Sequence, residues 1–254
     1  MAENQELTRT GEAGNQRSLV TYAIFVGLTP LIPVPFVDDL AQSYFRRRLV
    51  RLLAASHGHA LGPEDLDALV SERGGGCLSS CVVQAVVYPL KKVFQKIFYF
   101  LEWKRAADLT SRTYHYGYLL NYALQPPRAG GESIMALRGA SAVREAIEAV
   151  CRDSPIKPVE SAVGGTFRQS KRVLNSAADL LAQTLRRVAA VGRRPDEEQV
   201  ARAIETVEPA EEREIETVVT RMQKAIAGVP EEHFRNLRAQ LDARLGLKAV
   251  SSKQ

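Results

Sequence analysis

The chain has 254 residues, of which 45% are hydrophobic and 25% charged, and its formal net charge is +5. These values exclude wholesale disorder, and the length suits one large helical domain or two smaller ones. The mildly basic balance favours an anionic partner without choosing between phospholipid and nucleic acid. Three cysteines are too few for a disulfide framework, so a reducing compartment is expected.

The first apolar stretch follows a polar start. Residues 1–17 are polar and contain several acids, so we predict a disordered lead-in rather than a secretory signal. Residues 18–37 carry no charge, and a helix of that length could cross a bilayer. Proline removes a backbone donor and clashes with the preceding turn, so a straight crossing is not expected. We predict a helix over about 19–28, followed by an elbow that inserts shallowly, because prolines occupy positions 30, 33 and 35.

The elbow leads into a predicted helix over about 36–56. Its apolar positions recur at helical spacing, and arginines at 46, 47, 48 and 51 surround them. Asp38 and Asp39 stand in the first turn, where carboxylates interact well with exposed amides. Adjacent helical residues diverge by about 100°. The pair is therefore expected to cap the helix and not to form an acid–base site.

A second uncharged run covers residues 74–90, after a short predicted helix that opens at Pro63. Beyond the run, one helix face is predicted from apolar residues at i, i+3, i+4, i+7, i+8 and i+11. The face consists of Leu90, Val93, Phe94, Ile97, Phe98 and Leu101. Lysines lie off this face and Trp103 at its margin, a pattern typical of helices in a membrane surface and also of ordinary core helices.

The remaining segments also have helical periodicity. A helix over about 108–124 sets Tyr114, Tyr118 and Tyr122 in an i+4 row, and residues 125–131 form the candidate boundary between halves. Helices are then expected over 134–151 and 167–191, followed by apolar stripes around 200–207, 215–226 and 234–245. No useful strand pattern appears. The predicted fold is all-α: a multi-helix bundle with proline-broken apolar helices in the N-terminal half and amphipathic helical hairpins in the C-terminal half.

Four regions follow from this pattern. They are the lead-in at 1–17, an apolar helical region at 18–125, a soluble helical region at 132–247, and a tail at 248–254.

One segment resembles a known family. Gly27-Leu-Thr-Pro-Leu-Ile-Pro-Val-Pro-Phe-Val-Asp-Asp-Leu40, followed by Arg46-Arg-Arg48 and Gly58, is similar to a motif of EcsC-like proteins. It also resembles the hydrophobic helical domain attached to some bacterial membrane-associated GTPases. Phe36 stands where such elbows commonly have glycine, and the chain has no phosphate-binding Gly-x-x-x-x-Gly-Lys loop. The resemblance implies membrane association in a bacterial cell and brings no catalytic residue.

Other chemistry-bearing residues have simpler interpretations. Cys77 and Cys81 are four apart and could join His57 and His59 as zinc ligands, or they could be lipidated, although buried thiols are the expected outcome. His115 and His233 show no local triad spacing. We therefore predict no catalytic, cofactor-binding or metal-binding residue and no small-molecule substrate.

The sequence favours a non-enzymatic, membrane-associated helical protein, a scaffold or regulatory partner on the cytoplasmic face of an anionic membrane. The predicted membrane contacts are Phe25, Leu28, Leu31, Ile32, Phe36, Phe94, Ile97, Phe98, Leu101 and Trp103. The predicted head-group contacts are Arg46, Arg47, Arg48, Lys91, Lys92 and Lys96. Each basic residue near such a surface contributes about 1 kcal/mol.

Three alternatives remain open. One is a soluble helical module that buries both uncharged stretches and binds another protein through residues 196–246. Another is nucleic-acid binding, in which bases stack on the tyrosine row beside Arg46-Arg-Arg48; no nucleic acid is expected because acids dilute the basic residues. The last is an enzyme whose site is assembled only in space.

Overall fold

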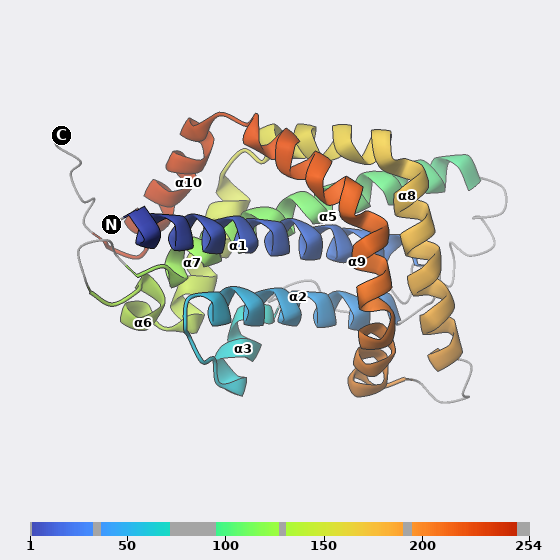
Figure 1. Cartoon of the computed structure of the whole chain (residues 1–254), viewed down its shortest axis with the longest axis horizontal. Helices are drawn as coiled ribbons and strands as arrows, with labels where there is room; N and C mark the ends of the chain where they lie inside the picture. Colours follow the sequence, from blue (N-terminus) through green and yellow to red (C-terminus); the bar gives the residue numbers. More distant parts are fainter. Residues whose placement is uncertain (1, 33–36, 72–94, 127–130, 190–194, 248–254) are drawn as a thin grey trace.

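A computed structural model describes residues 2–32, 37–71, 95–126, 131–189 and 195–247 (Figure 1). This part of the chain is an all-α bundle without strands. Its elements are α1 (Ala2–Leu28), η1 (Thr29–Leu31), α2 (Val37–Ser56), α3 (Pro63–Val70), α5 (Gln95–Leu124), α6 (Ile134–Arg138), α7 (Ala140–Asp153), α8 (Lys157–Ala189), α9 (Glu197–Ala227) and α10 (Glu231–Arg244).

Helix α1 runs through the middle of the bundle and contacts α2, α5 and α9 (Figure 1). Every residue from Leu19 to Leu28 for which exposure is described is buried, on all faces of the helix. A helix that is apolar all round must be covered on every side, by protein or by lipid. Here three helices cover it, and Phe25 stacks on Phe45 of α2 with ring centroids 4.9 Å apart.

The start of α1 differs from the sequence expectation. The helix already begins at Ala2, so the segment predicted as a disordered lead-in continues the central helix. Side-chain surroundings are described from Gly14 onward. Arg17 forms a 3.0 Å ion pair with Glu216 of α9, which fastens this part of the helix to the C-terminal half.

Helix α5 is one continuous helix of 30 residues, where the sequence predicted two separate segments. Its middle crosses α1 closely at Gly27. A Cβ atom placed on Gly27 would lie 2.8 Å from the carbonyl oxygen of Ala106 and 1.8 Å from Oγ1 of Thr110. Only a residue without a side chain allows the two backbones to approach this far.

The C-terminal half contains longer helices than predicted. Helix α8 starts at Lys157 and not at 167, and α9 runs unbroken through Pro209 and joins two stripes that the sequence analysis treated separately. Asp196 and Gln199 form a reciprocal capping box that fixes the start of α9. Gly139, with φ of 79°, separates α6 from α7 within the helix expected over 134–151. The described helices include none long and apolar enough to traverse a bilayer.

Candidate functional site

Exposed apolar and cationic side chains meet near the first turns of α5. Leu101 has 51% of its surface exposed, and among the large hydrophobic residues of the described chain only Leu137 of α6 is also exposed to such a degree. Lys104 and Arg105 follow it by one helical turn and are also exposed. The arrangement places an apolar side chain and two cations on one outward face of this helix.

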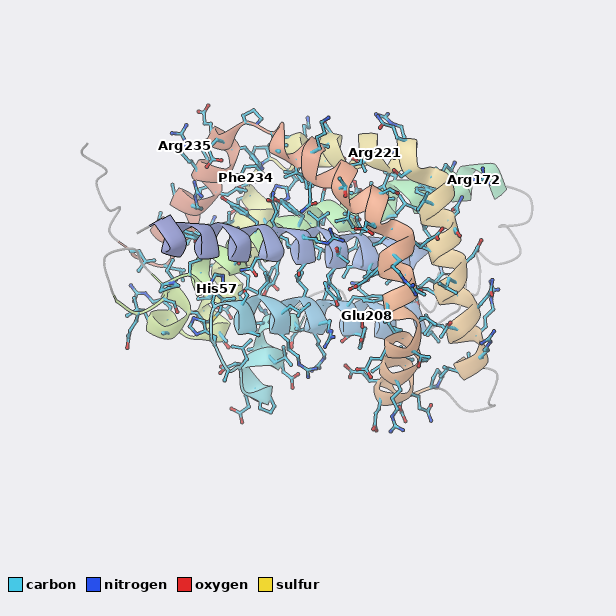
Figure 2. The ribbon with its side chains drawn as sticks, in the orientation of Figure 1. His57, Arg172, Glu208, Arg221, Phe234 and Arg235 are labelled. Carbon is cyan, nitrogen blue, oxygen red and sulfur yellow. The ribbon has the colours of Figure 1, made fainter. Side chains whose placement is uncertain are left out.

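Helix α8 packs against α5 on the side of Trp103 and carries further exposed cations. Trp103 of α5 packs edge-on against Phe167 of α8, with ring centroids 6.0 Å apart, and Nζ of Lys171 lies 5.5 Å from the centre of the tryptophan ring. Figure 2 labels Arg172 on α8. We call this surface the basic end; its residues are Leu101, Lys104, Arg105, Arg168, Lys171 and Arg172, all exposed.

The first apolar stretch does not contribute to the basic end. Phe25 and Leu28 have no exposed surface, and Ile32 is also buried, whereas Leu31 is partly buried against the core. The prediction that Phe25, Leu28 and Ile32 contact lipid is therefore wrong for this structure. The physical reason is that α2, α5 and α9 together cover the surface that a bilayer would otherwise cover.

Most of the second apolar stretch lies outside the part of the chain that the structure describes. Residues 74–90 lie outside the described residues, as do Phe36, Lys91, Lys92 and Phe94. Helix α5 includes Lys96, Ile97 and Phe98, but the surroundings of their side chains are likewise outside the described set. Within the predicted contact set, Leu101 is exposed and Trp103 is partly exposed.

The three consecutive arginines of α2 occupy three different environments. Arg47 forms ion pairs with Asp67 of α3, at 2.7 Å, and Glu197 of α9, at 3.0 Å. Arg48 lies 3.8 Å from Glu208 of α9 and remains half-exposed. Arg46 lines a cavity between α2, α3, α5 and α7. Arg47 and Arg48 thus have carboxylate partners inside the fold, which reduces their availability to head groups.

The histidines proposed as zinc ligands have other partners. Nε2 of His57 lies 2.8 Å from Oδ1 of Asn121, and Nε2 of His59 lies 3.0 Å from the carbonyl oxygen of Leu124. Both contacts tie the end of α2 to the end of α5. Cys77 and Cys81 lie outside the described residues, and no group of metal-binding side chains occurs within the described part of the chain.

Asp38 and Asp39 lie in the first turn of α2, as the sequence analysis placed them. Asp38 is half-buried whereas Asp39 is exposed, so the two carboxylates have different surroundings. Burial, reinforced by the charge of Asp39, raises the pKa of the Asp38 carboxyl above its ordinary value.

Helix α9 contributes a buried carboxylate cluster that was not predicted from the sequence. Glu208 of α9 accepts hydrogen bonds from the hydroxyls of Tyr22 on α1, at 2.5 Å, and Tyr44 on α2, at 3.0 Å (Figure 2 labels Glu208). Burial and the nearby Glu208 carboxylate raise the pKa of both tyrosines, so both hydroxyls keep their protons and can donate. One carboxylate therefore joins three helices.

Glu211 lies one turn further along α9 and is fully buried, and neither of its carboxylate oxygens has a hydrogen-bond partner among the residues that the structure describes. Burial, with a smaller contribution from Glu208, raises its pKa to about 8. Glu208 and Glu211 fall on the apolar stripe between Ile204 and Ile215. That position in a helical repeat was the signal from which the sequence could have revealed them.

His115 and His233 are far apart in sequence but form a pair in the fold. Their Nε2 atoms lie 3.0 Å apart, and Nδ1 of His115 donates to the carbonyl oxygen of Ser111 at 2.7 Å. Nε2 of His115 must then accept the hydrogen bond from His233. Burial lowers the pKa of His115 to about 4, with the neighbouring His233 as a minor cause.

The tyrosine row of α5 and the apolar stripes of residues 196–246, both predicted as alternative binding surfaces, face the interior of the bundle. Tyr114 is buried against Phe234 of α10, and the hydroxyl of Tyr122 donates to Asp242 of the same helix at 3.0 Å. The tyrosine row therefore packs on protein and does not offer free rings to bases. The apolar stripes of residues 196–246 are also buried, which leaves mainly their charged faces exposed.

Comparison of the chain with protein-family models, with curated proteins and with solved structures finds no match. The resemblance of residues 27–58 to EcsC-like proteins therefore stays a prediction.

Proposed function

We propose that the protein is a non-enzymatic, membrane-associated helical protein that binds anionic lipid through the basic end. The observation that carries this proposal is the 51% exposed Leu101 one turn before the exposed Lys104 and Arg105 of α5, with three more exposed cations on the neighbouring helix α8. An exposed apolar side chain can enter the acyl boundary while lysine and arginine meet head-group phosphates. Contact would be peripheral, by one end of the bundle.

Two further features support the same proposal. The second uncharged, proline-containing stretch, residues 74–90, comes shortly before α5 in the sequence. The segment from Gly27 to Gly58 resembles EcsC-like membrane-associated proteins of bacteria. A role as scaffold or regulatory partner on the cytoplasmic face would fit a bundle whose contact with lipid is confined to one end.

Vesicle binding tests this function. The protein is mixed with vesicles of phosphatidylcholine alone or with one quarter phosphatidylglycerol, and the bound fraction is measured by flotation at low and high salt. We expect binding only to the anionic vesicles, and weaker binding at high salt because surface charges are screened. Recovery of the full-length protein in the unbound fraction with anionic vesicles at low salt would overturn the proposal.

A matched pair of variants locates the contact. Lys104→Gln/Arg172→Gln removes two cations from the basic end, whereas Lys224→Gln/Arg235→Gln removes two exposed cations from α9 and α10. Figure 2 places Arg235 at the opposite end of the view from Arg172. At about 1 kcal/mol for each charge, the first variant should lower the partition coefficient by about thirty-fold. Equal weakening by both variants would show attraction by net charge and not by this surface.

The apolar part of the contact needs its own variant. Leu101→Ser should weaken binding to anionic vesicles without altering its salt dependence, because it removes apolar burial and no charge. Unchanged binding by Leu101→Ser would reduce the contact to electrostatic attraction.

A further inference from the structure

A second site lies between α2, α3, α5 and α7, away from the residues of the basic end. It is a cavity of about 690 Å³, in the size range of pockets that hold small organic ligands. Its lining comes from residues 46–50, 69–71, 109–116 and 148–156. Four separate segments therefore build one concave surface.

Much of the cavity wall is apolar. Leu49 and Val50 of α2 face it together with Leu69 of α3, Leu109 of α5 and Ile156. Cys151 also lines the cavity, and burial raises the pKa of its thiol to about 12. The thiol is therefore neutral at physiological pH and behaves as a small apolar group and not as a nucleophile.

The charged groups of the lining are mostly cationic. Arg46, Arg112 and Arg152 come from α2, α5 and α7, and the last two are exposed. Glu148 is the carboxylate among the lining residues, and Arg144 already pairs with it at 3.4 Å. The charge facing a ligand is therefore strongly positive.

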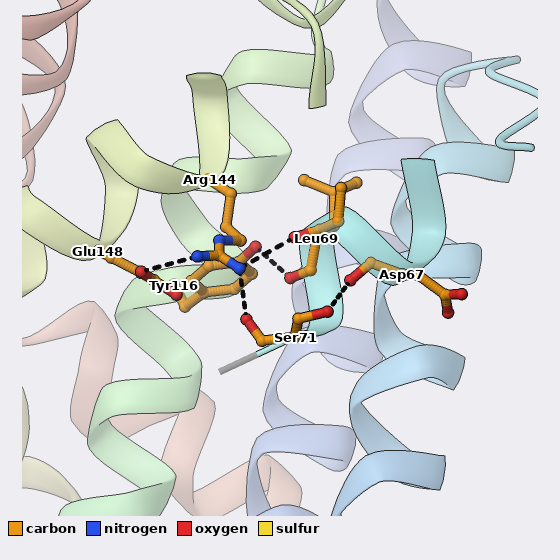
Figure 3. A network of polar contacts seen from close by, with 7 residues as sticks. Asp67, Leu69, Ser71, Tyr116, Arg144 and Glu148 are labelled. Carbon is orange, nitrogen blue, oxygen red and sulfur yellow. Dashed lines mark hydrogen bonds and ion pairs between the residues drawn. The ribbon is translucent and has the colours of Figure 1, made fainter. Parts of the chain in front are cut away.

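Arg144 also fixes the shape of the cavity (Figure 3). This buried arginine donates to the carbonyl oxygen of Ser71 at 2.6 Å, while the hydroxyl of Tyr116 donates to the carbonyl oxygen of Leu69 at 2.6 Å. Both bonds satisfy carbonyl groups at the end of α3, which would otherwise lack partners. The wall formed by α3 is thereby held against α5 and α7, so the cavity is preorganised.

One polar group of the lining lacks a partner. Thr113 is only 5% exposed and its Oγ1 forms no hydrogen bond within the described part of the chain. It follows Arg112 directly on α5. The oxygen itself has almost no accessible surface, so Thr113 belongs to the packed wall of the cavity and not to the groups offered to a ligand.

We infer that this cavity binds a small amphiphilic anion, with its acidic head held by Arg112, Arg152 and Arg46 and its alkyl chain against the apolar wall. The planar guanidinium groups match carboxylate and phosphate-ester heads alike. Val70, Leu109 and Ile156, which are partly exposed, offer apolar surface to such a chain. The inference does not rest on membrane binding, because none of the residues of the basic end lines the cavity.

Calorimetric titration with four probes tests the site. Decanoate and decyl phosphate supply both head and chain, decanol supplies the chain alone, and inorganic phosphate supplies the anion alone. We expect at least one of the two charged amphiphiles to bind at least ten-fold more tightly than decanol or phosphate, and their order identifies the preferred head group. Equal affinity for a charged amphiphile and decanol, tight binding of phosphate alone, or no binding of any probe would overturn the inference.

Variants assign the binding to this cavity. Arg112→Gln/Arg152→Gln should weaken the preferred amphiphile at least ten-fold and leave decanol unchanged; both side chains are exposed, so the fold should persist, as thermal unfolding can verify. Full affinity in this double variant would refute the assignment. Lys104→Gln/Arg172→Gln serves as the matched control, since it should retain amphiphile binding while losing vesicle binding. Arg112→Gln/Arg152→Gln should lose amphiphile binding and retain vesicle binding. Membrane binding by the basic end and ligand binding by the cavity can therefore be refuted independently.

Discussion

The hydroxyl of Tyr44 donates a 3.0 Å hydrogen bond to the carboxylate of Glu208, which lies 164 residues later in the chain. Tyr22 donates to the other oxygen of the same carboxylate. The contact joins the N-terminal helices α1 and α2 to α9, so the two halves inferred from the sequence share a buried polar connection. The contribution of this connection to the free energy of unfolding can be measured.

Removal of these donors should destabilise the bundle. Tyr22→Phe/Tyr44→Phe leaves the Glu208 carboxylate buried with neither hydroxyl, and a buried acceptor without its donors costs about 1–3 kcal/mol or more when it is charged. Urea unfolding should show a lower midpoint with an unchanged slope. Tyr118→Phe is the control, because the Tyr118 hydroxyl forms no hydrogen bond within the described residues. A double variant as stable as this control would contradict the proposed connection.

Glu211 should make the protein less stable as pH rises. Its native pKa of about 8 exceeds the ordinary value of 4.5, so the native state holds a proton that the unfolded chain has lost between these values. The free energy of unfolding therefore falls from about pH 4.5 to about pH 8. Glu211→Gln cannot titrate at this position. Its free energy of unfolding, relative to that of the parental protein, should therefore be higher at pH 8 than at pH 5 by on the order of 1–3 kcal/mol.

Exposed Glu214 on the same helix provides the comparison for Glu211. Denaturant unfolding at several pH values should show a flatter pH profile for Glu211→Gln and the parental profile for Glu214→Gln. Parallel profiles in all three proteins would mean that Glu211 is not held protonated in the native state.

The histidine pair should limit stability on the acid side. Burial lowers the native pKa of His115 to about 4, against an ordinary value of 6.5. The unfolded chain therefore binds more protons between these values, and the free energy of unfolding falls as pH is lowered from about 6.5 to about 4. We call this fall in the free energy of unfolding the acid limb, and His115→Gln should remove it. The same variant should lower stability near neutral pH by about 1 kcal/mol or more, because the hydrogen bond to Ser111 is lost.

A second destabilised variant separates the histidine effect from general weakening. Leu237→Ala deletes buried side-chain volume on α10 and should cost about 2–5 kcal/mol at every pH while the acid limb remains. If His115→Gln keeps the parental acid limb, the pair does not titrate as its burial requires.

Glycine substitutions test whether protein or lipid covers the first uncharged stretch. Gly27→Ala would push a methyl group against the Ala106 carbonyl and Thr110 of α5, and we expect a loss of about 1–3 kcal/mol. Gly164→Ala on α8 meets no atom within 4 Å and should gain up to about 1 kcal/mol from helix propensity. Thermal unfolding of both variants measures the contrast. Similar stabilities would show that α1 and α5 do not cross at Gly27 in solution.

The sequence by itself determined the helical character of this protein and several helix positions. Helix α2 begins within one residue of the predicted start, because the acids of its first turn and its apolar repeat are local signals. Helix α10 likewise follows Pro230 with acids in its first turn. The lengths of α5, α8 and α9 were underestimated, since tertiary packing sustains helix through Gly164, Gly165 and Pro209, where local propensity predicts interruption.

Only the tertiary structure decided what covers each apolar surface and which charges meet. A helix that is apolar on all sides has the same sequence pattern in a protein core as in a bilayer, so Phe25 and Leu28 could not be assigned before their neighbours were known. Arg47 and Arg48 are adjacent in the chain, yet Arg47 pairs with Asp67 and Glu197 whereas Arg48 lies beside Glu208. Burial and pairing depend on residues brought together from distant helices, and no local pattern encodes those distances.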